Sequence, residues 1–174
     1  MQVTKETTRI IAIVALLAVG SILNTSCDKS NPVRVLPEDV AGTYDFQQFV
    51  FIPDASALEP ANLLDTLAAN NTNLRLLDGG QFTLNYQFLG GPEAIISGDF
   101  SVSSTEIRLQ AAAGSEARLA SLLLHSPLRL RRNIDLDKLE ASVTKTVDLS
   151  AYAERYAGVP PVRGRLVIEM ILRD

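Results

Sequence analysis

From residue 40 onward, hydrophobic and polar residues alternate along most of the chain, and this two-residue period limits the folds that the chain can adopt. The clearest run is 81–88, where polar residues separate Phe82, Leu84, Tyr86 and Phe88. Successive side chains of a β-strand point to opposite faces, so such a run predicts a strand with one buried face. Similar runs lie at 43–52, 74–77, 96–103, 106–111, 128–134, 139–147 and 165–173.

Turn residues separate these predicted strands. Asp78-Gly79-Gly80 and Gly90-Gly91-Pro92 each follow a hydrophobic run, and glycine tolerates the positive φ that tight hairpins need. Two stretches break the alternation. The leucines between Pro60 and Asn70 predict a short amphipathic helix, and residues 115–124 predict one or two helical turns. We therefore expect an all-β fold with minor helical insertions.

About eight strands with one apolar face each need an architecture that hides those faces. An antiparallel up-and-down β-barrel encloses them and leaves no free edge. A two-sheet β-sandwich is the alternative. Strands that follow one another through short hairpins favour the barrel. The short strands and the aromatic content of 6% argue against a barrel that crosses the outer membrane.

The start of the chain has a different chemistry. Lys5 and Arg9 precede an apolar stretch over residues 10–23. A helix of that length reaches roughly 21 Å, which is less than the ~30 Å of hydrocarbon in a bilayer. The stretch is therefore typical of a signal peptide rather than of a stable membrane span.

Cys27, the one cysteine of the chain, follows this stretch directly after Thr25 and Ser26. These residues resemble the box of bacterial lipoproteins, in which small residues precede a cysteine that becomes lipid-modified and N-terminal. The resemblance implies a membrane-anchored lipoprotein of the cell envelope, on the outer membrane or the periplasmic side, with acyl chains such as palmitate on Cys27. An ordinary signal cleaved nearby, or an uncleaved anchor, would leave a free thiol instead.

The predicted organisation has three parts. Residues 1–26 are the lipoprotein signal peptide, residues 27–39 are the lipidated cysteine and an extended tether with two prolines, and residues 40–174 are the β domain. Removal of residues 1–26 leaves 14 basic and 19 acidic residues, a net charge of −5. A modestly acidic domain does not attract nucleic acid.

Catalytic and metal-binding patterns are missing from the sequence. The single histidine, His125, lies near a predicted helix end, where a surface or capping role is expected. Asp135 and Asp137 are turn formers without the oxygen ligands of a calcium loop. Gly90-Gly91-Pro92 has no following lysine and hydroxyl residue, so it does not predict a phosphate loop. We expect no catalytic residue, no metal and no cofactor, and we do not expect an enzyme.

The β domain resembles the lipocalin-like barrels, in particular small bacterial lipoproteins of that type. The likeness rests on Gly42-Thr43-Tyr44, on Gly79-Gly80-Gln81-Phe82 and on Gly98-Asp99-Phe100. In lipocalins the first strand carries a Gly-x-Trp motif, and a basic residue from the last strand packs over the ring. The resemblance places Tyr44 at the Trp position, with Arg163 or Arg165 as the cation, and it implies a cup for small apolar molecules.

Two cations lie in phase with apolar residues: Arg132 with Leu128 and Leu130, and Lys145 with Val143 and Val147. An unpaired buried charge is costly. Each cation therefore pairs with a carboxylate, reaches the strand end at the barrel mouth, or meets the anionic group of a lipid or fatty acid in the cup. The candidate ligand-facing residues are Tyr86, Phe88, Phe100, Arg132, Lys145, Ile168 and Met170.

Two functions remain open. One is a lipid-anchored envelope lipoprotein whose lipocalin-like domain binds a small hydrophobic ligand. The other is a non-enzymatic interaction or assembly module in the envelope, with a filled barrel and a protein partner. The state of the barrel interior distinguishes them, because a filled barrel needs a recognition surface elsewhere. An outer apolar patch of Phe49, Phe51, Val167 and Ile171 is the candidate for that surface.

Overall fold

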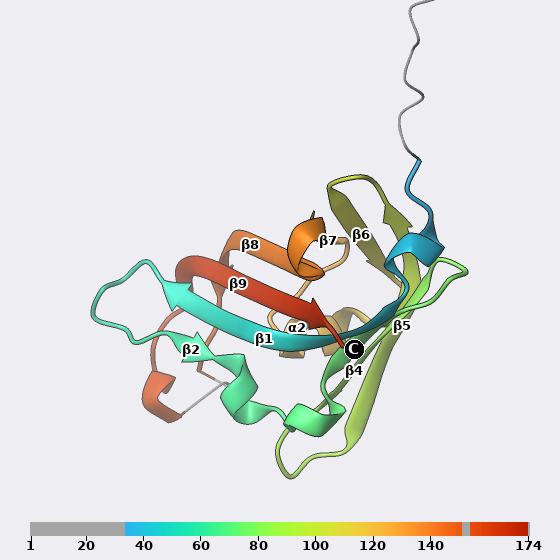
Figure 1. Ribbon diagram of the computed structural model, residues 1–174. Coiled ribbons are helices and arrows are strands. Elements are labelled where there is room, and N and C mark those ends of the chain that lie inside the picture. The colour runs from blue at the N-terminus through green and yellow to red at the C-terminus, as the bar shows by residue number, and fades with distance from the viewer. Residues whose placement is uncertain (1–33, 151–153, 174) are drawn as a thin grey trace, which may run out of the picture. The chain divides into compact units, whose positions relative to one another are not determined.

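The computed structural model describes residues 34–150 and 154–173, so the predicted leader and Cys27 lie outside the described residues. The described chain forms one antiparallel sheet (Figure 1). Its strands are β1 (Gly42–Pro53), β2 (Ala61–Asn62), β3 (Asn73–Leu76), β4 (Gln81–Gln87), β5 (Glu93–Val102), β6 (Glu106–Ala111), β7 (Leu128–Asn133), β8 (Lys138–Val147) and β9 (Val162–Leu172). Its helices are α2 (Glu116–Ser121) and the 3-10 helices η1 (Pro37–Val40), η2 (Leu63–Thr66), η3 (Ala69–Asn71), η4 (Ile134–Leu136) and η5 (Glu154–Tyr156).

The sheet closes on itself. The strand order is β1-β3-β4-β5-β6-β7-β8-β9, and β1 pairs back with β9. The two partners share β1: Gly42–Asp45 pairs with β3, and the long segment from Tyr44 to Pro53 pairs with β9. The short β2 adds beside Val50 and Phe51. The fold is an eight-stranded up-and-down barrel with one extra strand, as the sequence predicted, and it is not a sandwich.

A β-bulge in β1 changes which residues face the interior. Phe46 pairs with Met170 and Gln48 pairs with Glu169, so Gln47 is an extra residue without a partner in β9. One extra residue reverses the alternation of the strand that carries it. Tyr44 is therefore buried before the bulge, and Phe49 after it. A strict alternation over the predicted strand 43–52 would place Val50 and Ile52 on the inner face with Tyr44, but both are only partly buried because of the bulge.

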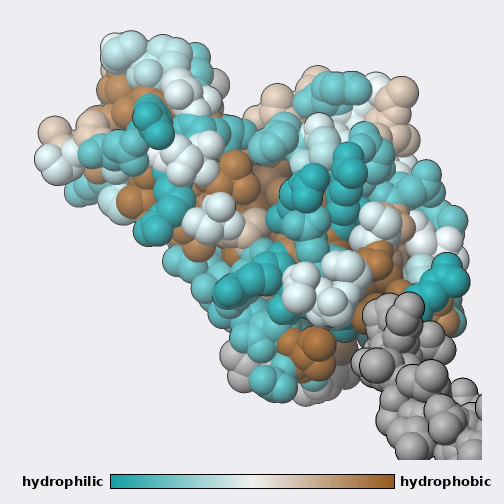
Figure 2. All heavy atoms as spheres, turned by 90° about the horizontal axis from the view of Figure 1, so that it is seen from above, coloured by the Kyte–Doolittle hydropathy of each residue, from teal (hydrophilic) through white to brown (hydrophobic). Residues whose placement is uncertain are grey.

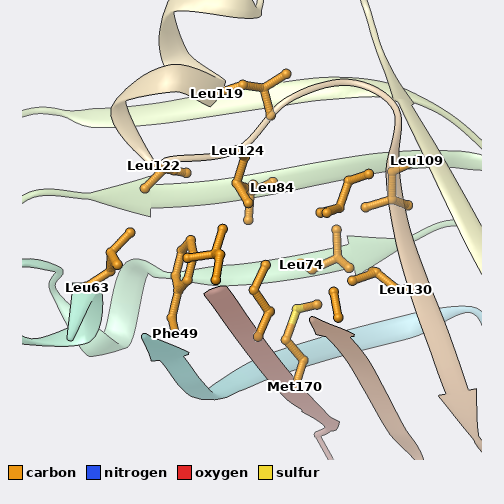
Figure 3. Close-up of a cluster of buried hydrophobic side chains, with 14 of the residues drawn as sticks. Phe49, Leu63, Leu74, Leu84, Leu109, Leu119, Leu122, Leu124, Leu130 and Met170 are labelled. Atoms are coloured by element: carbon orange, nitrogen blue, oxygen red, sulfur yellow. The ribbon is translucent and has the colours of Figure 1, made fainter. Parts of the chain in front are cut away.

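The barrel interior is filled by hydrophobic side chains. Residues from all eight barrel strands and from the connecting segments form a single buried cluster. Figure 3 shows Leu74, Leu84, Phe49 and Met170 in this cluster, with Leu119, Leu122 and Leu124 from the segment around α2 beside them. Every buried polar side-chain atom in the described part of the chain has a hydrogen-bond partner. The core therefore has the close packing and the satisfied polar groups of an ordinary protein interior.

The two ends of the barrel differ in the length of their connections. At one end, here called the entry rim, η1 leads into β1 and short turns join β3 to β4, β5 to β6 and β7 to β8. At the other end, the far rim, lie the connections 54–72, 88–92, 112–127 and 148–161. Buried side chains from three of these connections cover the far rim: Leu63, Leu119, Leu122, Leu124, Leu149 and Tyr156. Val40 of η1 is buried at the entry rim.

The helix predicted between Pro60 and Asn70 is absent. That segment forms β2, η2 and η3 instead. Its 3-10 turns keep short internal bonds, such as the Leu67 amide to the Leu64 carbonyl at 3.2 Å. Its backbone also bonds to the chain at the end of β4: the Ala68 amide donates to the Gln87 carbonyl at 2.8 Å, and the Thr66 carbonyl accepts from the Leu89 amide at 2.9 Å. The helical turn predicted over 115–124 is confirmed as α2. At the predicted tether, η1 replaces the extended chain expected at residues 37–39.

Candidate functional site

Five of the seven candidate ligand-facing residues belong to the packed interior. Tyr86, Phe100, Ile168 and Met170 are at most 8% exposed. Phe88 packs edge-on against Tyr86, with 5.6 Å between the ring centroids. The Tyr86 hydroxyl lies 3.3 Å from the hydroxyl of Ser121 at the end of α2. The side chains expected to line a cup therefore contact one another and the segment that covers the far rim.

The other two candidates, Arg132 and Lys145, lie at opposite ends of the barrel. Arg132 pairs with Leu139 near the entry rim, whereas Lys145 lies six residues further along β8 and pairs with Gly164 near the far rim. At about 3.3 Å per residue, six residues of strand separate their backbones by about 20 Å. The fold does not bring these two cations together, and one small anionic group cannot reach both.

Lys145 connects the barrel wall to the segment that covers the far rim. Its ammonium donates a hydrogen bond to the Leu123 carbonyl at 2.6 Å. Burial lowers the pKa of Lys145, because a charged amine is less stable away from water. No carboxylate pairs with it among the residues that the structure describes. The aliphatic stem of Lys145 thus brings its ammonium to the end of the strand, where a backbone carbonyl is its hydrogen-bond partner.

The entry rim has a small hollow of about 120 Å³ beside Tyr44, Arg132 and Asp137. The Tyr44 hydroxyl donates to the Val40 carbonyl at 2.9 Å. Burial raises the pKa of Tyr44, and the positive charge of Arg132 opposes that shift. The Arg132 guanidinium donates to the Ser103 carbonyl at 3.2 Å. Tyr44 and Arg132 thus donate their hydrogen bonds to backbone carbonyls of the protein. Neither is paired, among the described residues, with a general base that would make it a nucleophile.

Ion pairs on the wall of the barrel occupy several of the remaining charges. The Lys138 ammonium lies 3.0 Å from a Glu140 oxygen and 2.8 Å from a Glu169 oxygen. The hydrogen bond to Glu169 is the main reason that the pKa of Lys138 is raised, and the bond to Glu140 adds to it. Arg131 also pairs with Glu140, and this bond holds the pKa of the Glu140 carboxyl below its ordinary value. These pairs join β7, β8 and β9 from the outside.

The cation predicted over the Tyr44 ring is not Arg163 or Arg165. Tyr44 pairs with Leu172, whereas Arg165 pairs with Ile52 at the other end of β1. Arg163 forms an ion pair with Asp54 at 3.6 Å. The prediction is wrong because the register of β1 against β9 places both arginines at the far rim. Arg173, just after β9, lies at the opposite, entry-rim end of β1. It donates two hydrogen bonds to the Asp45 carboxylate, of 2.8 and 2.5 Å.

The predicted outer apolar patch does not form as a unit. Phe49 and Phe51 are fully buried, because the bulge turns them inward. Val167 is partly buried, and Ile171 is 39% exposed. On the face shown in Figure 2, hydrophobic residues lie in small areas separated by hydrophilic ones. That face therefore does not offer one broad apolar surface with which to bind a partner protein.

A polar hollow of about 200 Å³ lies on the outer wall of the barrel, and sequence reasoning missed it. Asparagines of η3, β3 and β4 line it, together with Glu93 and Ile95 of β5; we call it the amide groove. The asparagine-rich stretch 70–73 was the available signal. Its place beside β4 and β5 depends on strand pairing, which local patterns do not give.

The described part of the chain shows no site for a metal ion built from three or more His, Cys, Asp or Glu side chains. His125 is exposed. None of the helices that the structure describes is long and hydrophobic enough to cross a membrane. Comparisons of the chain with protein-family models, with curated proteins and with solved structures give no match.

Proposed function

We propose that this chain is a lipid-anchored, non-enzymatic protein of the bacterial cell envelope that recognises a partner with the outer surface of a filled barrel. The observation that carries this proposal is the packed interior. Tyr86, Phe100 and Met170, which a hydrophobic ligand would have to touch, are buried among other side chains. A barrel of this size either holds a ligand or fills its interior with its own side chains.

The arrangement of the connections supports the same function. The chain enters the barrel through η1 at the entry rim, so a tether from Cys27 would reach the domain at that end. The long connections all lie at the far rim, away from the point of attachment. Long loops on a rigid scaffold are where proteins commonly place recognition residues. The far rim and the wall next to it are therefore the surfaces best placed to meet a partner.

Mass spectrometry of the full-length protein tests the anchor. We expect the mature protein from the membrane fraction to begin at an acylated Cys27. The Cys27→Ser variant should lose the acyl chains and leave the membrane fraction. An unmodified Cys27 in the membrane-bound wild type, or a mature N-terminus at another residue, would contradict the lipoprotein assignment.

Native mass spectrometry after mild extraction, together with thermal unfolding, tests the filled barrel. We expect no lipid retained by non-covalent binding, and no change in Tm when fatty acids or lysolipids are added to delipidated protein. A rise in Tm with a fatty acid would contradict the proposal and favour a hydrophobic ligand inside the barrel. A co-purified envelope component that binds the wild type would support recognition by the outer surface.

A further inference from the structure

The amide groove lies on the outer wall of β3, β4 and β5, close to the far rim. Asn73 pairs with Asn85, and Asn85 pairs with Ile95, so the three residues form a row across three neighbouring strands. The residues that follow Asn73 and Ile95, and the one that precedes Asn85, are buried leucine and isoleucine: Leu74, Ile96 and Leu84. Since side chains alternate along a strand, the row faces outward.

Hydrogen bonds between side chains hold the amides of the groove in place. The Asn85 amide nitrogen donates to the Asn73 side-chain oxygen at 3.1 Å. The Asn71 amide nitrogen donates to the Gln87 side-chain oxygen at 2.5 Å, and Gln87 in turn donates to the Gly91 carbonyl at 2.8 Å. Each of these asparagines keeps a hydrogen-bonding group for a ligand, because an amide carries both a carbonyl and two N–H donors.

Two further polar groups at the groove have no partner in the fold. In residues 34–150 and 154–173, nothing hydrogen-bonds to the side-chain amide of Asn70 or forms an ion pair with the Glu93 carboxylate. Ile95 is 52% exposed and gives the groove one apolar surface. Ala94 and Tyr86 also line the groove. Fixed amides beside these few less polar side chains suit a ligand that is polar at its edges and apolar on one face.

The charges of the groove exclude other ligand classes. No lysine or arginine lines it, and Glu93 is its one charged lining residue. Arg118, the cation next to it, donates to the Ile95 carbonyl at 3.2 Å. A phosphate or sulfate would therefore meet the Glu93 carboxylate, and no cation lines the groove to balance that charge. An apolar chain would desolvate several amides without replacing their hydrogen bonds, which costs free energy.

We propose that the amide groove binds an uncharged carbohydrate. Sugar hydroxyls donate and accept hydrogen bonds, as the asparagine amides do, and the C–H face of a sugar ring can pack on Ile95. The source of the carbohydrate rests on the proposed function, because a barrel tethered in the envelope would meet envelope glycans with a groove near its far rim. Binding itself requires only the folded barrel and not the anchor.

Saturation-transfer NMR and calorimetry on the full-length protein in detergent test this proposal. The probes are neutral oligosaccharides, namely maltotriose, cellotriose, mannotriose and chitotriose, with sialyllactose as the anionic comparison. We expect at least one neutral probe to bind more tightly than sialyllactose. Asn85→Ala should weaken its binding more than tenfold, and Ile95→Arg should abolish it by filling the groove without removing an amide.

The matched control is Thr83→Ala, which changes the next outward residue of β4 outside the groove and should leave binding within twofold. A Tm equal to that of the wild type shows that Ile95→Arg still folds. The absence of binding for all four neutral probes, a preference for sialyllactose, or unchanged binding by Ile95→Arg would overturn the proposal. Glycan binding by the Cys27→Ser variant would show that this site acts independently of the anchor.

Discussion

Gly98 on β5 lies at a close approach of a neighbouring strand. It pairs with Phe82 of β4 on one side and with Ala111 of β6 on the other. A Cβ at this position would lie 2.1 Å from the Gln110 carbonyl oxygen and 2.8 Å from the Ala111 Cα. Both of those atoms are backbone, so they cannot move aside as a flexible side chain would. Glycine is required here by the approach of β6 and not by a turn.

Gly98→Ala should therefore destabilise the barrel. Forcing a methyl group into a well-packed site typically costs about 1–3 kcal/mol, and urea unfolding followed by circular dichroism would measure it. Ser97→Ala, at the neighbouring exposed position, is the control and should change the free energy of unfolding by less than about 0.5 kcal/mol. Equal stability of the two variants would mean that β5 and β6 are further apart than described.

Lys145 gives a second prediction about a single side chain. Lys145→Met keeps most of the aliphatic stem but removes the donor to the Leu123 carbonyl. We expect faster hydrogen exchange at the amides of Leu122 and Leu124, which bond to Leu119, because the covering segment loses a fixed point. The change in Tm should be small, since the desolvation of the ammonium is removed as well. Thr144→Ala, an outward-facing neighbour, should leave the exchange rates unchanged.

The β1 strand shows how one element can differ from its own sequence pattern. Its residues favour a strand throughout, and that part of the prediction is correct. The bulge at Gln47 then moves Phe49 and Phe51 into the core. Phe49 stacks on Phe46, with 5.2 Å between the ring centroids and 14° between the planes. The register against β9 decides this arrangement, and no local rule places the bulge.

Substitutions on either side of the bulge test the exchange of faces. Phe49→Ala should lower the free energy of unfolding by about 3–5 kcal/mol, because it leaves a cavity at a fully buried position. Val50→Ala, at the partly exposed next position, should cost about 1 kcal/mol or less. Chemical denaturation of both variants would measure the difference. The reverse order of costs would mean that β1 has no bulge and that the alternation of the sequence holds throughout.

At the scale of the whole molecule, closure of the barrel depends on the pairing of the first and last barrel strands. An ion pair with two hydrogen bonds joins the start of β1 to the end of β9: Arg173, which follows β9, donates both to the carboxylate of Asp45 in β1. The hydrogen bond from Arg173 holds the pKa of the Asp45 carboxyl below its ordinary value of 3.8. Its contribution to stability is therefore present above that ordinary value and is lost as pH falls through the lower pKa of the folded state.

Thermal unfolding of wild type and Asp45→Asn as a function of pH tests this contribution. We expect the wild type to have the higher Tm at pH 7, and the difference to shrink as pH falls below about 4. The effect should be modest and should decrease with added salt, because both side chains are partly exposed. Asp99→Asn, at an exposed position without an ion pair in the described residues, is the control. A difference in Tm that stays constant down to low pH would contradict the assignment.

Local chemistry determined the class of fold and most of the strands. A two-residue period and glycine turns act between neighbours in the chain, so Gln81–Gln87 and the hairpin before it could be recognised from the sequence. Tertiary structure decided which faces meet. The bulge in β1, the side chains that fill the interior and the row of Asn73, Asn85 and Ile95 all depend on register between strands. Register is fixed by packing across the whole barrel, and no short stretch of sequence contains that information.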